Sequence, residues 1–157
     1  MNRIIDNPRL GDVLVKLNSE VENRRVTWHV TKVSGDGDTL FLVSSEGDAE
    51  CISSYDENFR PAYHDEKQSY DAPYTRAYML ADIFETYLKE DGCAGMELIK
   101  MRVRKVRDDL GGWIVTITCM DGDTPMGSID IPYYTDPVVA LRMAQRGIAA
   151  ICGADFG

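Results

Sequence analysis

The side chains that could act as nucleophiles, bases or metal ligands are few in this sequence, and they lie far apart. There are only two histidines, His29 and His64, and the four cysteines have no C-x-x-C spacing. Nucleophilic catalysis needs a serine or cysteine beside a base, and zinc needs clustered ligands. The sequence contains no nucleophile elbow, P-loop or glycine-rich dinucleotide turn. We therefore expect no catalytic residues, no metal, no cofactor and no enzymatic activity.

Two Asp-Gly-Asp sequences, residues 36–38 and 121–123, look like fragments of a calcium-binding loop. A calcium loop continues with oxygen ligands at alternate positions and ends on a distal glutamate, which neither sequence provides. Small and acidic residues also tolerate the backbone angles of tight turns. We interpret both sequences as turns between strands.

Positive charge is concentrated in residues 98–107, which read as a strand of alternating basic and apolar residues. In a strand, alternate side chains share one face. This face could bind a nucleic acid or an acidic protein, or its charges could pair with Asp108 and Asp130 on neighbouring strands. The basic face consists of Lys100, Arg102 and Arg104, with Lys105 and Arg107 at its end.

Negative charge is concentrated in residues 34–71, where ten acidic residues face two basic ones, a net charge of -8. Turns and linkers must face water, so these carboxylates are expected at the surface. Such a surface suits docking into a basic groove, where carboxylates replace phosphates, although it could also serve solubility alone. The candidate acidic surface comprises Asp36, Asp38, Glu46, Asp48, Glu50, Asp56 and Glu57.

Aromatic residues are frequent from residue 55 to residue 78. Aromatic side chains with a polar tip often anchor protein interfaces, and they could equally seal a junction between two domains. The candidate aromatic anchors are Tyr55, Phe59 and Tyr63.

The first half of the chain shows the period-two alternation of half-buried strands, separated by turn residues. Short strands are predicted at 13–17, 26–31, 39–43 and 49–53, with a last one near 59–63. Their order and spacing, with Gly11-Asp12-Val13 and Trp28-His29-Val30, resemble SH3-like small barrels of the Tudor or KOW type. The resemblance implies that residues 1–64 form a small all-β barrel.

The second half follows an acidic linker predicted at residues 65–72. The apolar stripe at 73–91 predicts a helix, and a hairpin at 98–119 and a strand at 126–133 come next. Asp136-Pro137 is a typical helix start. Residues 73–157 are therefore expected to form an α-β-β-β-α domain, whose three-stranded antiparallel sheet is covered on one face by two helices. The covered face is predicted to carry Met101, Val103, Val115, Ile117, Ile129 and Ile131.

The predicted fold class is α+β, and the order of elements in residues 73–157 resembles that of double-stranded RNA-binding domains. Those domains use a basic start to the last helix to reach phosphates. The corresponding residues here are Tyr134-Thr135-Asp136-Pro137, which are not basic.

The formal net charge of -9 repels nucleic acids and anionic lipids and attracts basic partners. With no export signal and no apolar stretch long enough to span a membrane, we expect a cytoplasmic protein. An unpaired edge strand in the second sheet leaves a homodimer open.

The leading hypothesis is a non-enzymatic acidic protein that binds a protein with a basic surface, such as a nucleic-acid-binding complex. In size and charge the chain resembles phage or mobile-element inhibitors of host nucleic-acid machinery, of the anti-CRISPR or anti-restriction type. The alternative is a nucleic-acid-binding module that uses the small barrel and the basic face.

Overall fold

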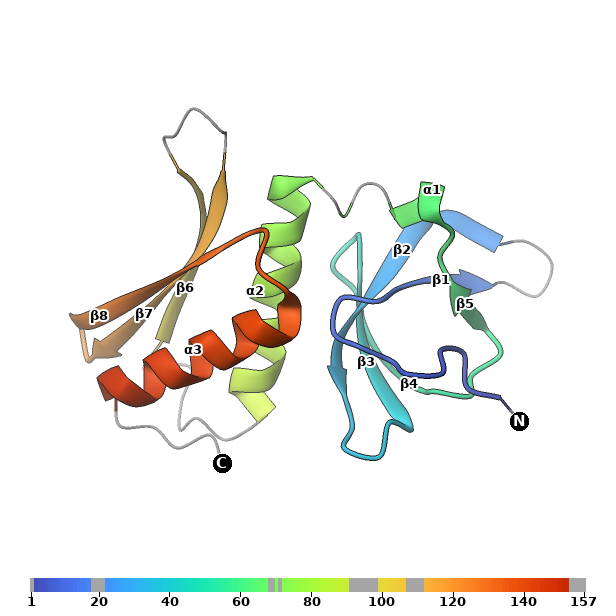
Figure 1. Ribbon diagram of the computed structural model, residues 1–157, viewed down its shortest axis with the longest axis horizontal. Coiled ribbons are helices and arrows are strands. Elements are labelled where there is room, and N and C mark those ends of the chain that lie inside the picture. Colours follow the sequence, from blue (N-terminus) through green and yellow to red (C-terminus); the bar gives the residue numbers. More distant parts are fainter. Residues whose placement is uncertain are drawn as a thin grey trace. The chain divides into compact units, whose positions relative to one another are not determined.

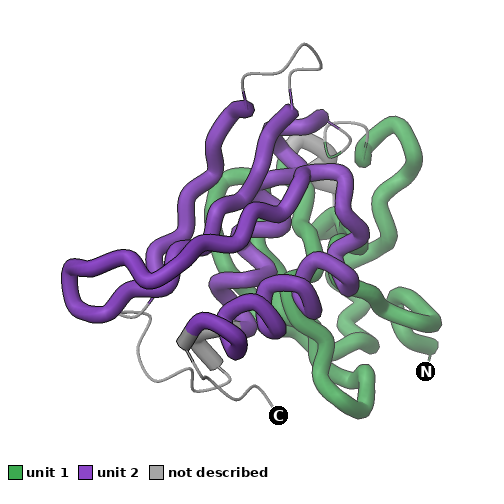
Figure 2. Tube along the Cα trace, turned by 60° about the vertical axis from the view of Figure 1, so that its left-hand side comes forward, with its two compact units in different colours: residues 1–71 green, residues 72–157 purple. Residues whose placement is uncertain are grey.

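The computed structural model describes residues 2–17, 22–67, 70, 72–90, 99–106 and 112–152. The chain is a mixed α+β protein, as the sequence predicts. It divides into two compact units, Met1–Asp71 (unit 1) and Ala72–Gly157 (unit 2), which are coloured separately in Figure 2. Unit 1 contains a five-stranded sheet, and unit 2 contains a three-stranded sheet.

In unit 1, each of the first three strands pairs with the next strand along the chain, and the fifth returns to pair with the first (Figure 1). The strands form one antiparallel sheet in the order β4-β3-β2-β1-β5. Alternation along β3 is complete, since Leu40 and Leu42 are buried and Phe41 and Val43 between them are partly exposed. The elements are β1 (Val13–Leu17), β2 (Glu22–Val33), β3 (Thr39–Ser44), β4 (Ala49–Ser53), β5 (Phe59–Pro61) and α1 (His64–Lys67).

The sheet of unit 1 is curled into a half-barrel. Strands β1 and β4 are separated by two strands, so a flat sheet would hold them about 14 Å apart. Lys16 on β1 nevertheless forms a 3.0 Å ion pair with Glu50 on β4. The concave side encloses a core in which the rings of Trp28 and Phe59 meet edge to face, 6.0 Å apart. The buried core residues are Leu14, Trp28, Val30, Leu40, Leu42, Ile52 and Phe59.

The segment predicted to be a linker, residues 65–72, is partly structured. Helix α1 includes three of the residues from 65 onward, and Tyr70 is only 6% exposed. The hydroxyl of Thr27 on β2 donates a 3.0 Å hydrogen bond to Tyr70 Oη, and the ring of Tyr70 lies 5.6 Å from that of His29. Two polar contacts fix the segment as well, because Glu66 accepts hydrogen bonds from Arg60 at 2.8 and 2.9 Å.

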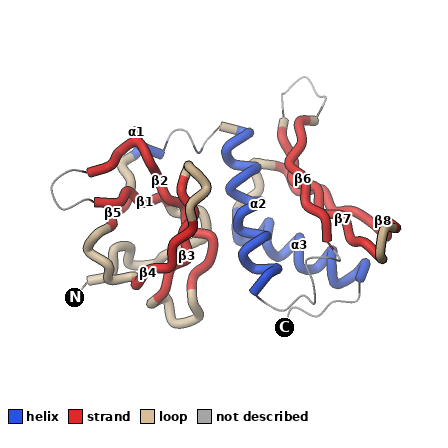
Figure 3. Tube along the Cα trace, turned by 180° about the vertical axis from the view of Figure 1, so that it is seen from behind, coloured by secondary structure: helices blue, strands red, loops and turns tan. Residues whose placement is uncertain are grey.

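Unit 2 consists of two helices and an antiparallel sheet in the order β6-β7-β8. Figure 1 and Figure 3 show both helices on one side of this sheet, and both pack against it. None of the described helices is long and apolar enough to cross a membrane. The elements are α2 (Pro73–Glu90), β6 (Ile99–Lys105), β7 (Trp113–Asp121), β8 (Thr124–Pro132) and α3 (Pro137–Cys152).

The register of the three strands decides which side chains face the helices. Val115 pairs with Ile131, and both are fully buried. On the other face, Lys100 and Arg102 are exposed. Helix α3 begins as predicted, because Asp136 Oδ2 accepts hydrogen bonds from the amides of Val138 and Val139 at 3.1 and 3.3 Å.

Helix α3 approaches strand β8 so closely that only glycine fits at position 147. A Cβ atom added to Gly147 would lie 2.5 Å from Ile129 Cδ1 and 2.6 Å from its Cγ1. The glycine therefore sets the distance between the helix and the sheet in unit 2.

Gly147→Ala is expected to destabilise the protein, although this change usually favours a helix. Overpacking against Ile129 outweighs the gain in helix propensity, so we expect a net loss of about 1 to 2 kcal/mol. Urea unfolding monitored by circular dichroism measures this loss. Ile129→Ala removes both Cγ1 and Cδ1, so Gly147→Ala should cost less stability in that background than in the wild type. An equal cost in both backgrounds would contradict the proposed clash.

Candidate functional site

The seven candidate acidic residues are distributed over both ends of strand β3. Strand β3 separates Asp36 and Asp38, which precede it, from Glu46 and Asp48, which follow it. A strand of six residues places its ends about 17 Å apart. The amide of Ser54 bonds to the carbonyl of Asp38 at 2.8 Å. The loop that carries two further candidates, Asp56 and Glu57, therefore starts beside the end of β3 at which Asp38 lies.

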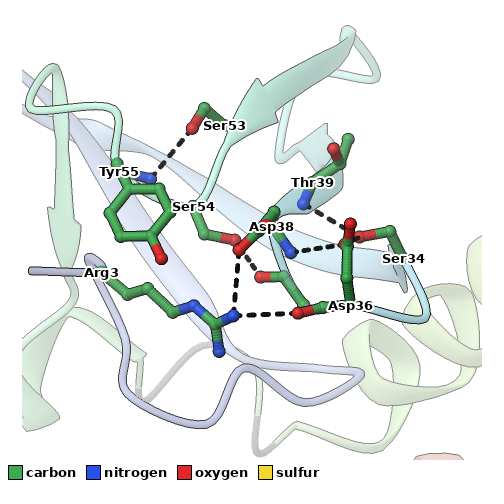
Figure 4. Close-up of polar contacts among 9 residues, drawn as sticks. Arg3, Ser34, Asp36, Asp38, Thr39, Ser53, Ser54 and Tyr55 are labelled. Carbon is green, nitrogen blue, oxygen red and sulfur yellow. Dashed lines mark hydrogen bonds and ion pairs between the residues drawn. The ribbon is translucent and has the colours of Figure 1, made fainter.

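The first group of carboxylates is built into a network around Arg3, which we call the Arg3 cluster: Arg3, Ser34, Asp36, Asp38 and Tyr55 (Figure 4). Arg3 Nη2 donates 2.9 Å hydrogen bonds to the carbonyl of Asp36 and to Asp38 Oδ1. Its guanidinium carbon lies 6.0 Å from the centre of the Tyr55 ring. The network ties the N-terminal segment to the turn between β2 and β3.

Within the Arg3 cluster, Asp36 also shapes the turn. Its Oδ1 accepts hydrogen bonds from Ser34 Oγ at 2.6 Å and from the amide of Asp38 at 2.9 Å. The hydrogen bond from Ser34, followed by that from the Asp38 amide, holds the pKa of Asp36 below its ordinary value. The pKa of Arg3 is raised, first by a hydrogen bond with Tyr55 and then by one with Asp38. Charge in this cluster therefore serves the fold.

The second group lies in the turn between β3 and β4, which we call the β3–β4 tip: Glu46, Gly47 and Asp48. Ser44 Oγ accepts hydrogen bonds from the amides of Glu46 and Asp48, at 3.2 and 3.0 Å. Gly47 supplies the positive φ of 90° that the turn requires. Both acidic residues are exposed, and neither carboxylate is ion-paired or hydrogen-bonded to a residue that the structure describes. The tip thus presents two available carboxylates on an ordered turn.

Glu50 is the seventh candidate, and its charge is already neutralised. It pairs with Lys16, whose Nζ also lies 5.6 Å from the centre of the Trp28 ring and 5.7 Å from that of Phe59.

The three candidate aromatic anchors have different environments. Phe59 is 4% exposed and belongs to the core, so it is not available to a partner. Tyr55 is partly exposed within the Arg3 cluster. Tyr63 is 54% exposed, and the guanidinium of Arg60 lies 4.2 Å from its ring centre. Arg60 is held in place by two hydrogen bonds to Glu66, at 2.8 and 2.9 Å.

The basic face lies on the uncovered side of the unit 2 sheet, and one of its cations is paired. Arg104 donates to Thr116 Oγ1 at 3.0 Å and lies 3.5 Å from Asp130 Oδ2, so the expected pairing with Asp130 is confirmed. Lys100 and Arg102 form no ion pair with any described residue. Lys105 follows Arg104 directly in β6 and lies opposite Trp113 in the register. It therefore lies on the other face of the sheet from Lys100, Arg102 and Arg104. Arg107 and Asp108 lie outside the described residues.

Two features of the surface were not predicted from the sequence. The sequence does not indicate the contacts of Arg3, because the residue lies in an irregular segment and Asp38 is 35 residues away in the chain. Tyr134 is the most exposed of the large hydrophobic residues described, at 71%. Its position two residues before the helix start at Asp136 indicated that Tyr134 lies in a turn.

Among the described residues, no three histidine, cysteine, aspartate or glutamate side chains are grouped to hold a metal ion. Comparison of the chain with protein-family models, curated proteins and solved structures finds no match. The interpretation therefore depends on the chemistry of the surfaces described above.

Asp36→Asn is expected to lower stability in a pH-dependent way. Asparagine keeps the accepting oxygen but removes the charge. Because the pKa of Asp36 is lowered in the folded protein, its ionised form stabilises the fold above its ordinary pKa, and this contribution is lost as the pH falls through the lowered value. The wild type should therefore be more stable at neutral pH, and the two proteins should converge in acid.

Urea unfolding over a series of pH values tests this expectation. Asp65→Asn, at an exposed position in α1, is the matched control and should leave the pH profile of stability unchanged. A constant difference between wild type and Asp36→Asn at every pH would rule out a role for the charge.

Proposed function

We propose that this protein is a non-enzymatic binding protein whose acidic unit 1 docks on a basic surface of another protein. The observation that carries the proposal is the β3–β4 tip, where Glu46 and Asp48 are exposed and form no ion pair with a described residue. A carboxylate without an internal partner sacrifices no ion pair when it meets a cation. Binding through such groups costs only their desolvation.

The other candidate carboxylates contribute to the negative field more than to direct contact. Asp38 and Glu50 are paired with Arg3 and Lys16, and a partner would have to compete with those cations. The net charge of -8 in residues 34–71 still attracts a basic partner over a distance and raises the rate of encounter. The proposed contact is therefore led by the β3–β4 tip and supported by the charge of unit 1.

The kind of partner we propose is a protein with a basic groove that ordinarily binds nucleic acid. Carboxylates on a turn can occupy positions that phosphates would take in such a groove. The size and acidity of the chain resemble those of phage or mobile-element inhibitors of the anti-CRISPR or anti-restriction type. An SH3-like barrel in unit 1 remains a prediction that goes with this proposal.

Reversing the charge of the β3–β4 tip tests the proposal. The immobilised chain is used to isolate a partner from the native cell, and the purified partner is titrated against wild type and Glu46→Lys/Asp48→Lys by calorimetry. We expect the variant to bind at least about tenfold more weakly, and wild-type binding to weaken as salt rises.

The turn between β7 and β8 provides a matched control. Asp121 and Asp123 flank a glycine in an exposed turn, as Glu46 and Asp48 do. Asp121→Lys/Asp123→Lys changes the net charge by the same amount and should retain binding. Equal loss in both variants would indicate non-specific charge attraction, and no loss in either would refute docking through the tip.

A nucleic-acid-binding module is a second candidate, favoured by the uncovered face of the unit 2 sheet. Lys100 and Arg102 project there without a carboxylate partner among the described residues. The hydroxyls of Thr118 and Ser128 lie on the same face, 3.0 Å from each other. Cations and hydroxyls on an open sheet are the groups that contact phosphates. In this candidate, the small β unit and the basic face share one ligand.

Electrophoretic mobility shift with single- and double-stranded DNA and RNA at low salt tests the second candidate. If it is right, wild type shifts a nucleic acid and Lys100→Glu/Arg102→Glu does not. Arg142→Glu/Arg146→Glu, at two exposed positions on helix α3, is the control with the same charge change and should keep the shift. Absence of a wild-type shift would exclude this candidate.

A further inference from the structure

Exposed residues on one face of helix α3, together with Tyr134 on the turn before it, are what we call the α3 surface: Tyr134, Val139, Arg142, Met143 and Arg146. Tyr134 is 71% exposed, Val139 48% and Met143 40%, and both arginines are exposed. The buried stripe of the helix is separate, and it consists of Ala140, Leu141, Ala144 and Ile148. The outer apolar residues are therefore not needed to fill the core of unit 2.

Tyr134 is displayed on a turn that is fixed on both sides. Arg76 on α2 donates hydrogen bonds to the carbonyls of Tyr133 and Thr135, at 3.1 and 3.3 Å. The rings of Tyr133 and Tyr134 meet edge to face at 5.5 Å, and Asp136 then caps the helix. An exposed aromatic ring on an ordered turn loses little conformational entropy on binding.

The charge of the α3 surface is opposite to that of the protein as a whole. Residues 137–152 contain no acidic residue, while the chain carries a net charge of -9. Arg142 and Arg146 lie one turn apart on the helix and form no ion pair with a described residue. Tyrosine, methionine and arginine are enriched at the centre of protein interfaces, where lysine and acidic residues are depleted.

We propose that the α3 surface is a docking site for a second protein, one that presents carboxylates beside an apolar pocket. The pocket would receive Tyr134 and the apolar pair Val139 and Met143, and the carboxylates would pair with Arg142 and Arg146. Two arginines that pair with no carboxylate in the described part of the chain, and a pre-ordered tyrosine, give this contact both charge complementarity and an anchor.

A lipid surface and a second copy of this chain fit the α3 surface less well. An interfacial helix needs a broad apolar face, whereas only two apolar residues of α3, Val139 and Met143, are among the large hydrophobics exposed here. A symmetric dimer through this patch would bring like charges together, Arg142 and Arg146 against their copies. The carboxylates of the β3–β4 tip have Ser45, Gly47 and Ala49 beside them in the chain, none of which is a large apolar residue.

This inference does not depend on the proposed function, because it concerns another unit and a partner of opposite charge. If both hold, unit 1 binds a basic protein and unit 2 an acidic one. Either can fail alone, since the variants that test them are different.

Selection from a displayed library of small folded domains with a randomised concave surface, on the immobilised full-length chain, tests the docking site. We expect enriched domains to combine aspartate or glutamate with large apolar residues on that surface. Their affinity is then measured by fluorescence polarisation. Tyr134→Ala and Arg142→Glu/Arg146→Glu should each weaken binding about tenfold or more. Arg9→Glu/Lys67→Glu, with the same charge change at two exposed positions of unit 1, should bind as wild type does.

Several results would overturn the docking site. The first is that the selection enriches nothing, and the second is that the enriched binding surfaces are basic or purely apolar. The third is that all variants bind equally. Wild type could bind vesicles containing phosphatidylserine more strongly than vesicles of phosphatidylcholine alone. If Arg142→Glu/Arg146→Glu loses this difference, the patch is assigned to a membrane instead. Concentration-dependent dimerisation in size-exclusion chromatography with light scattering, lost in the same variant, would assign it to a second copy.

Discussion

In the sheet of unit 2, one face is buried against helices, and the register of the strands decides which side chains remain available for binding. In unit 2, the pairing of Met101 with Ile117 and of Val115 with Ile131 turns the apolar residues toward α2 and α3. The same register leaves Lys100 and Arg102 uncovered. A slip of one residue would exchange the two sets, so the core and the basic face are specified together.

Charge in unit 1 is divided between structural and available groups. Arg3, Lys16 and Arg60 each engage a carboxylate, Asp38, Glu50 and Glu66 respectively. The Arg60–Glu66 pair is the least exposed, with 14% and 4% of the side chains accessible, and its loss would strand a buried charge. Ser44 organises the turn that carries Glu46 and Asp48. Their carboxylates form no ion pair with a described residue. This division is the physical basis for placing the proposed contact at the β3–β4 tip.

The two proposed docking surfaces follow different physical strategies. The β3–β4 tip offers charge on a turn, which favours fast encounter and depends on salt. The α3 surface offers a pre-ordered tyrosine with apolar neighbours and arginines, which favours a desolvated contact of longer lifetime. A chain with both would link a basic and an acidic protein.

The sequence by itself determined the fold class and most of the elements, because alternation in β3 and the Asp136-Pro137 helix start are local signals of period and capping. Pairing of the basic face with Asp130 was one of two alternatives that the sequence allowed, and Arg104 on β6 forms it with Asp130 on β8, across β7. Only the tertiary structure decided the rest. The curl that brings Lys16 to Glu50, the burial of Phe59 and the bond between Arg3 and Asp38 join residues distant in the chain. Such contacts depend on how whole elements pack, and no local pattern encodes them.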